Sequence, residues 1–159
     1  MKRKFDIYLA GAMHGRTVGE VLAERSRAKL FCEFYGLSYY DPAEDEGLQN
    51  LPLDHIIDMK PDLHRMAGYV TKDELNLSKC RSILVLTGDR SSSGTGWEMG
   101  MSFWKLKIPI SIVAPNMVRG KLVNFTTIKV DYISLTTEGA VACLADYLEG
   151  VNALSRRSY

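Results

Sequence analysis

The chain has 159 residues and a net charge of +1, which is the size of one domain and gives no electrostatic reason to expect nucleic acid as a partner. Hydrophobic residues make up 46% and charged residues 25%, as in an ordinary globular protein, so composition excludes wholesale disorder, collagen and a disulfide scaffold. The longest apolar run is far shorter than the roughly 20 residues that span a bilayer, so we expect no membrane-spanning helix.

The predicted elements alternate between strand and helix patterns along the chain. In chain order they are strand Lys4–Ala10, helix Thr17–Tyr35, strand Leu37–Tyr40, loop Ala43–Pro52, helix Leu53–Met59, helix Val70–Lys79, strand Arg81–Thr87, loop Gly88–Gly94, helix Thr95–Leu106, strand Ile108–Ala114, strand Ile128–Ile133 and helix Thr136–Leu148. This alternation predicts one α/β domain over residues 1–159, a three-layer sandwich around a mostly parallel, five-stranded sheet of the Rossmann or flavodoxin-like kind.

The three cysteines indicate a reducing compartment. Cys32, Cys80 and Cys143 are odd in number and widely spaced, which suits free thiols better than disulfides or a metal site. The basic residues 1–4 run straight into the first predicted strand, so we expect no signal peptide and a cytoplasmic location. The three histidines show no ligand spacing, and we expect no metal and no organic cofactor.

Ligands of open parallel sheets bind outside the carboxyl ends of the strands. Three segments lie there in the predicted fold: Gly11–Thr17, Asp41–Leu53 and Gly88–Glu98. The last of them is the most informative, because it leaves the central strand, turns on small residues and enters a helix whose N-terminus could receive an anion or sugar hydroxyls. It is neither a Walker A loop nor the dinucleotide fingerprint.

Glu98 is the only charged residue between Arg90 and Lys105. A lone carboxylate among apolar neighbours needs a partner or a chemical task, and the nearby helix N-terminus would favour its ionised, nucleophilic form. The alternative is structural, because Thr95-x-x-Glu98 also reads as a capping box.

Three further residues could serve the same site. Asp73 precedes the central strand and could share nucleophile and acid/base roles with Glu98 at a glycosidic bond, or could simply be an acid in the first turn of its helix. Tyr8, near the end of the first strand, could hydrogen-bond a catalytic carboxylate or could pack in the core. Arg16 is a candidate phosphate ligand, although single basic residues usually have no specific ligand.

Three elements together resemble the nucleoside 2-deoxyribosyltransferase family, whose superfamily also contains N-glycosidases of nucleoside 5′-monophosphates. They are Ile7-Tyr-Leu-Ala-Gly-Ala-Met13, then Asp73, then Ser93-Gly-Thr-Gly-Trp-Glu-Met-Gly100. The resemblance runs from Ile7 to the last helix, and its specific part is G-T-x-x-E-x-G followed by Lys107-Ile-Pro109.

The resemblance implies a role for each matching residue. Glu98 matches the nucleophile that forms a deoxyribosyl ester, Asp73 the carboxylate that contacts sugar and base and helps move the proton, and Tyr8 the tyrosine that holds the nucleophile. It also implies a homo-oligomer, a dimer or larger, in which Asn124 binds the sugar 5′-hydroxyl in the neighbouring subunit's site. Where the transferases have an acid shortly before the nucleophile, this chain has three serines, and the nearest acid is Asp89. The expected substrate-binding residues are Gly11, Met13, Arg16, Asp89, Ser91, Ser92, Ser93, Gly94, Gly96 and Asn124.

Three functions follow as hypotheses. The first is an N-deoxyribosyltransferase that moves the sugar of a 2′-deoxynucleoside to another nucleobase, or to water. The second is a hydrolase of nucleoside 5′-monophosphates, in which Ser91–Ser93 and Arg16 hold the phosphate. The third is a nucleotide-binding module that keeps the fold without the reaction. All three expect small-molecule partners, a nucleoside or nucleotide and a free base, and neither nucleic acid nor a membrane.

Overall fold

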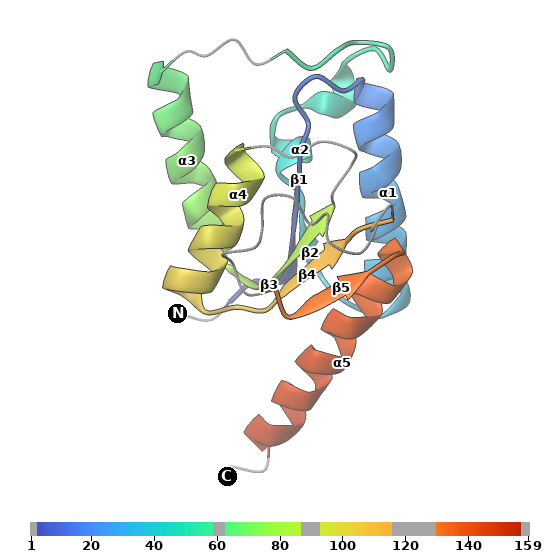
Figure 1. The fold of residues 1–159 in the computed structure, drawn as a ribbon, viewed down its shortest axis with the longest axis vertical. Coiled ribbons are helices and arrows are strands. Elements are labelled where there is room, and N and C mark those ends of the chain that lie inside the picture. Colours follow the sequence, from blue (N-terminus) through green and yellow to red (C-terminus); the bar gives the residue numbers. More distant parts are fainter. Residues whose placement is uncertain (1–2, 59–62, 87–92, 116–129, 157–159) are drawn as a thin grey trace.

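A five-stranded parallel sheet forms the centre of the protein (Figure 1). The computed structural model describes residues 3–58, 63–86, 93–115 and 130–156. The strands are β1 (Phe5–Gly11), β2 (Tyr39–Tyr40), β3 (Cys80–Leu86), β4 (Ile110–Val113) and β5 (Tyr132–Ser134). They lie in the order β2-β1-β3-β4-β5, and every neighbouring pair is parallel, which confirms the predicted α/β class.

Helices cover both faces of this sheet (Figure 1). The helices are α1 (Val18–Phe34), α2 (Pro42–Asp45), α3 (Leu63–Leu77), α4 (Ser93–Gly100) and α5 (Thr137–Arg156), with a 3₁₀ turn η1 (Leu48–Asn50) and a π-helix η2 (Met101–Leu106). In the picture α1 and α5 lie on one side of the sheet, and α3 and α4 lie on the other. The arrangement is the three-layer sandwich that the sequence predicts.

Alternate side chains of β1 point to opposite layers, as the two-residue period of a strand requires. Ile7 and Leu9 pack with buried residues of α1 and α5. Tyr8 and Ala10 pack in a second cluster that also contains residues of α3 and α4. The alternation matters for function, because it turns Tyr8 toward the two helices that carry Asp73 and Glu98.

The chain reverses its direction across the sheet between β1 and β3. From β1 it first moves outward to β2, and it then returns to β3 on the other side of β1. The carboxyl ends of β1 and β3 therefore flank a topological switch point, where open α/β sheets form their ligand crevice. Gly11 and Leu86, which pair at these ends, mark its floor.

Gly11 is a glycine because β1 and β3 approach closely here. A β-carbon at this position would lie 2.6 Å from the carbonyl oxygen of Leu86. We expect Gly11→Ala to lower the free energy of unfolding by about 1–3 kcal/mol, the cost typical of overpacking. Chemical denaturation measures this, with Gly150→Ala in α5 as the control. A β-carbon at Gly150 meets nothing within 4 Å, so the control should be stabilised by about 0.5–1 kcal/mol. Equal stability of the two variants would contradict the close approach.

Two predicted elements are wrong, and both lie between β2 and α3. The predicted loop Ala43–Pro52 contains α2 and η1. Asp41 starts α2, since its side chain accepts a hydrogen bond from the amide of Ala43 and Pro42 occupies the first turn. The predicted helix Leu53–Met59 is not helical over residues 53–58, because its backbone pairs instead with the start of α1.

Other helix boundaries differ less. The helix expected from Val70 already begins at Leu63, and the helix expected to end at Leu148 continues to Arg156. The helix predicted over Thr95–Leu106 begins at Ser93 and changes to a π-helix at Met101.

Among the described residues, no helix is both long and apolar enough to cross a membrane.

Candidate active site

Tyr8 and Glu98 meet at the switch point of the sheet. The Tyr8 hydroxyl donates a hydrogen bond of 2.8 Å to Oε1 of Glu98. Tyr8 is fully buried in β1 and stacks on Tyr40, with 5.6 Å between the ring centroids. Both sequence interpretations of Tyr8 therefore hold: its ring packs in the core, and its hydroxyl fixes the carboxylate of Glu98.

Asp73 completes the group from α3. It is partly buried, and this burial raises the pKa of its carboxyl group, although the nearby Tyr8 hydroxyl lowers it. Since α3 begins at Leu63, Asp73 lies ten residues into the helix, so the first-turn interpretation of this acid is wrong. The structure thus brings together Tyr8, Asp73 and Glu98 from three separate elements.

The helix-cap interpretation of Glu98 also fails. Because α4 begins at Ser93, Thr95 lies inside the helix and is not its N-cap residue. The carboxylate of Glu98 is instead held across the layers by Tyr8. Ser102, which is fully buried, donates a hydrogen bond of 2.8 Å to the main-chain carbonyl of Glu98. The change from α- to π-helix follows directly after Glu98, and such changes are frequent at functional sites.

Electrostatics make Glu98 a carboxyl group that titrates near neutrality. Burial raises its pKa from 4.5 to about 7. The hydrogen bond from Tyr8 and the charge of Arg25 lower this pKa, whereas the charges of Asp73 and Glu46 raise it. Burial likewise raises the pKa of Asp73. With a pKa of about 7, the Glu98 carboxyl group can be ionised, and therefore nucleophilic, at neutral pH although it is buried from water.

Tyr8 keeps its proton at every physiological pH. Burial, followed by the negative charge of Glu98, raises the pKa of its hydroxyl far above the usual range. The phenol therefore acts as a permanent donor to the carboxylate and not as a base.

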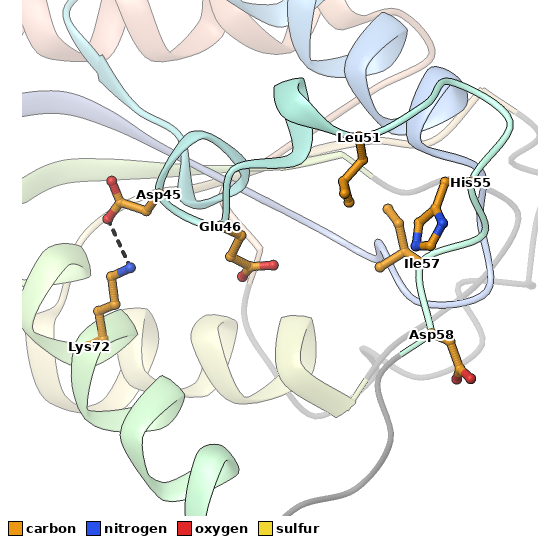
Figure 2. A pocket seen from close by; sticks show the side chains of 7 residues that line it. All are labelled: Asp45, Glu46, Leu51, His55, Ile57, Asp58 and Lys72. Atoms are coloured by element: carbon orange, nitrogen blue, oxygen red, sulfur yellow. Dashed lines mark ion pairs between the residues drawn. The ribbon is translucent and has the colours of Figure 1, made fainter.

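A cavity of about 370 Å³ lies between α2, the segment after it and α3. Its lining, shown in Figure 2, comes from α2, the segment after it and α3: Asp45, Glu46, Leu51, His55, Ile57, Asp58 and Lys72. Lys72 directly precedes Asp73, so α3 carries both a residue that lines the cavity and Asp73. Asp45 and Lys72 form an ion pair of 3.2 Å at one edge, and Leu51 and Ile57 supply an apolar surface at the other.

The outer wall of the cavity is anchored to the start of α1. Gly15, Val18 and Gly19 donate main-chain hydrogen bonds to the carbonyls of residues 57, 55 and 53, and the amide of residue 57 donates to Arg16. Ile57 also packs with Val18 in a small separate core. These bonds explain why residues 53–58 are not helical, and they make the wall a fixed part of the fold.

Arg25 and Asp41 form a buried ion pair that connects α1 to the start of α2. Arg25 is 2% exposed, and its guanidinium donates to Asp41 and to the carbonyl oxygen of Leu9 in β1. Lys29 lies 2.6 Å from the other oxygen of Asp41. Arg25 was not predicted from the sequence, although a signal exists. It lies on the buried face of α1, where a charge requires a partner, together with Val18, Val21, Ala28 and Cys32.

The remaining predicted residues fall into three groups. Gly11 ends β1, Met13 packs against the small core of Val18 and Ile57, and Gly94 and Gly96 lie in the first turn of α4. Arg16 forms an ion pair of 2.7 Å with Glu24, so its guanidinium is engaged with α1. Asp89, Ser91, Ser92 and Asn124 lie outside the described residues, and of Ser93 only the backbone is described.

Tyr8→Phe tests the hydrogen bond to Glu98. The variant keeps the ring and its stacking on Tyr40 but loses the donor, so the pKa of Glu98 should rise further. We expect kcat/KM for base release to fall by about 10- to 100-fold, with the acidic limb of the pH profile moved to higher pH. The matched control is Tyr39→Phe, which removes a hydroxyl 3.1 Å from Glu33 on the outer surface. An unchanged limb in Tyr8→Phe would show that Tyr8 does not tune the nucleophile.

Comparisons with known proteins connect this geometry to a class of fold. No family model matches the chain, and no curated protein matches its sequence. Among solved structures, the fold is that of the 2-deoxyribosyltransferases. One matching structure is the 2-deoxyribosyltransferase of the psychrotolerant bacterium Bacillus psychrosaccharolyticus, with a TM-score of 0.60 over 87% of this chain and 95% of that one. Sequence identity is 19%, so the likeness concerns the fold.

Proposed function

We propose that the protein is an N-deoxyribosyltransferase that cleaves the N-glycosidic bond of 2′-deoxynucleosides and passes the sugar to another nucleobase or to water. The observation that carries this proposal is the hydrogen bond of 2.8 Å by which Tyr8 holds Glu98 beside Asp73 at the switch point of the sheet. The likeness in fold to a 2-deoxyribosyltransferase supports it.

In the proposed reaction Glu98 attacks the anomeric carbon as the nucleobase departs. The departing base leaves an oxocarbenium-like sugar, which the carboxylate first stabilises and then traps as an ester. Asp73 contacts the sugar and the base, and Tyr8 keeps the attacking oxygen in place. A second base then displaces Glu98 from the same carbon, so two inversions retain the configuration. Carboxylates perform these steps without an organic cofactor.

A neighbouring subunit completes the site in this proposal. Asn124 of one chain would bind the sugar 5′-hydroxyl in the next, which requires a homo-oligomer.

Hydrolysis of nucleoside 5′-monophosphates uses the same nucleophile, so the test must separate the two reactions. Purified protein is incubated with 2′-deoxynucleosides, with and without a second free base, and in parallel with the 5′-monophosphates. Chromatography with mass detection follows the products. We expect a new deoxynucleoside that appears only with the acceptor base. Release of base from monophosphates alone would replace the proposal by the hydrolase, and binding without release from any substrate would replace it by a non-catalytic module.

A further inference from the structure

Tyr40 packs directly against the tyrosine of the candidate site. It belongs to the two-residue strand β2 at the edge of the sheet, and it is the register partner of Tyr8 in β1. The two rings stack with 5.6 Å between their centroids, and the ring of Phe5 lies 5.7 Å from that of Tyr40. The ring of Tyr40 therefore supports the side chain that holds Glu98.

The hydroxyl of Tyr40 is bound on two sides. It accepts a hydrogen bond of 2.6 Å from Nδ2 of Asn76 in α3, and it donates a hydrogen bond to Asp45 at the end of α2. Asp45 in turn forms an ion pair of 3.2 Å with Lys72 of α3 (Figure 2). The hydroxyl thus attaches α3 to β2 twice, directly at Asn76 and through Asp45 at Lys72.

Asp73 lies between these two attachment points. Lys72 and Asn76 are four residues apart, about one turn, so their side chains are neighbours along the helix. Asp73 directly follows Lys72 and stands three residues before Asn76, a spacing that also makes neighbours on a helix surface. A shift of this turn of α3 relative to β2 would carry Asp73 with it.

The distance between Asp73 and Glu98 matters for the proposed reaction. Among the groups that act on Glu98, burial and the charges of Asp73 and Glu46 raise its pKa, whereas Tyr8 and Arg25 lower it. If Asp73 came closer, Glu98 would keep its proton and could not attack. If Asp73 moved away, it would lose its contact with the sugar. A misplacement of about 1 Å can cost about 100-fold in rate.

We propose that Tyr40 is a positioning residue that sets the spacing of the two carboxylates, its ring holding Tyr8 beside Glu98 and its hydroxyl holding the turn of α3 that carries Asp73. The proposal rests on the proposed function. Burial, followed by the hydrogen bond to Asp45, raises the pKa of Tyr40 far above physiological pH. The hydroxyl therefore stays a donor to Asp45 and moves no proton in the reaction.

Tyr40→Phe tests the hydroxyl apart from the ring. The variant keeps the stacking on Tyr8, but Asn76 loses its acceptor while only 8% exposed. An unpaired amide is costly when buried, so this turn of α3 should move outward toward water and take Asp73 away from Glu98. We expect kcat for base release from a 2′-deoxynucleoside to fall by about 10- to 100-fold, with KM within about threefold of the wild type.

The pH profile gives a readout that a merely structural role would not move. With Asp73 further away and Glu98 less buried, the pKa of Glu98 should fall, because both effects raise it in the wild type. The acidic limb of Tyr40→Phe should therefore move to lower pH, opposite to the shift expected for Tyr8→Phe. A ¹³C NMR titration of the Glu98 carboxyl group measures the same pKa without substrate.

Two further variants make the test specific. Tyr39→Phe, the matched control on the same strand, removes a hydroxyl that donates to Glu33 on the outer surface, so its kcat and its acidic limb should be unchanged. Asn76→Leu removes the bond to Tyr40 from the side of α3 and should move the limb as Tyr40→Phe does. The double variant should lose no more activity than about either single variant, because both act through one bond.

An unmoved limb in Tyr40→Phe would overturn the proposal, even if the variant is slower or less stable, and so would a limb at higher pH or additive losses in the double variant. If Glu98→Ala is inactive while Tyr40→Phe behaves as the wild type, the proposed function stands and the role of Tyr40 is wrong. If the wild type releases no base from any 2′-deoxynucleoside or 5′-monophosphate, the proposed function is wrong. The NMR titration then still decides the spacing, since an unmoved pKa of Glu98 in Tyr40→Phe would contradict it.

Discussion

Glu98→Gln is expected to abolish base release, lowering kcat/KM by about 10⁴-fold or more, because the amide cannot form the ester with the sugar. Steady-state kinetics on the best deoxynucleoside measure the loss. For the wild type, the same assay should show activity rising with pH through about 7, since burial gives Glu98 that pKa and only its ionised form attacks. Tyr8 and Asp73 remain in place in the variant, so substrate binding should persist.

Stability provides the control for this variant. The folded protein binds a proton at Glu98 more tightly than the unfolded chain does, because its pKa is raised from 4.5 to about 7. Ionisation of the buried Glu98 therefore lowers the free energy of unfolding of the wild type. This loss is absent below pH 4.5 and grows as the pH rises to 7, to about 3 kcal/mol at most. Glutamine removes this penalty, so the variant should gain stability over the wild type between these pH values. An inactive variant that is also less stable at pH 8 would indicate misfolding and not the loss of a nucleophile.

Asp41→Asn is expected to cost about 3–5 kcal/mol of unfolding free energy, because it leaves the buried guanidinium of Arg25 without its counter-charge. Asparagine can still cap α2, so the loss of stability measures the effect of the charge alone and not that of the helix cap. Single domains are stabilised by only about 5–15 kcal/mol, so the effect is large. Thermal and denaturant unfolding measure it. Glu44→Gln, which removes the exposed partner of Lys29, should cost less than about 1 kcal/mol.

The companion variant Arg25→Met links this ion pair to the active site. The charge of Arg25 lowers the pKa of both Glu98 and Glu46. Its removal should move the acidic limb of the pH profile to higher pH, in addition to destabilising the fold. A variant that is less stable but has an unmoved limb would show that Arg25 supports the sheet without acting on the carboxylates.

The sheet, its class and two residues of the candidate site, Tyr8 and Glu98, could be predicted from the sequence because their signals are local. Strand β3 is an almost continuous apolar run, and Glu98 is an isolated charge in an apolar helix. The alternation of Ile7, Tyr8 and Leu9 indicates that the tyrosine faces the layer opposite to its neighbours.

The segment between β2 and α3 could not be predicted because long-range contacts decide its structure. Residues 53–58 have a helix-like pattern, but their backbone pairs with Gly15–Gly19 at the start of α1. Glu46 lies in a stretch that reads as a polar loop, and only the fold shows that it lines a cavity together with Lys72 of α3. Asp73 was ambiguous for the same reason, since its place in α3 depends on where that helix begins.

The most direct test of the central claim is to trap the sugar on the protein. The enzyme is mixed with a 2′-deoxynucleoside in the absence of an acceptor base, quenched in acid, digested with trypsin and analysed by mass spectrometry. We predict that the peptide from Ser91 to Lys105 gains the mass of one deoxyribosyl group, with the modification on Glu98. Base release with an unmodified Glu98, or with the sugar on another residue, would contradict the account.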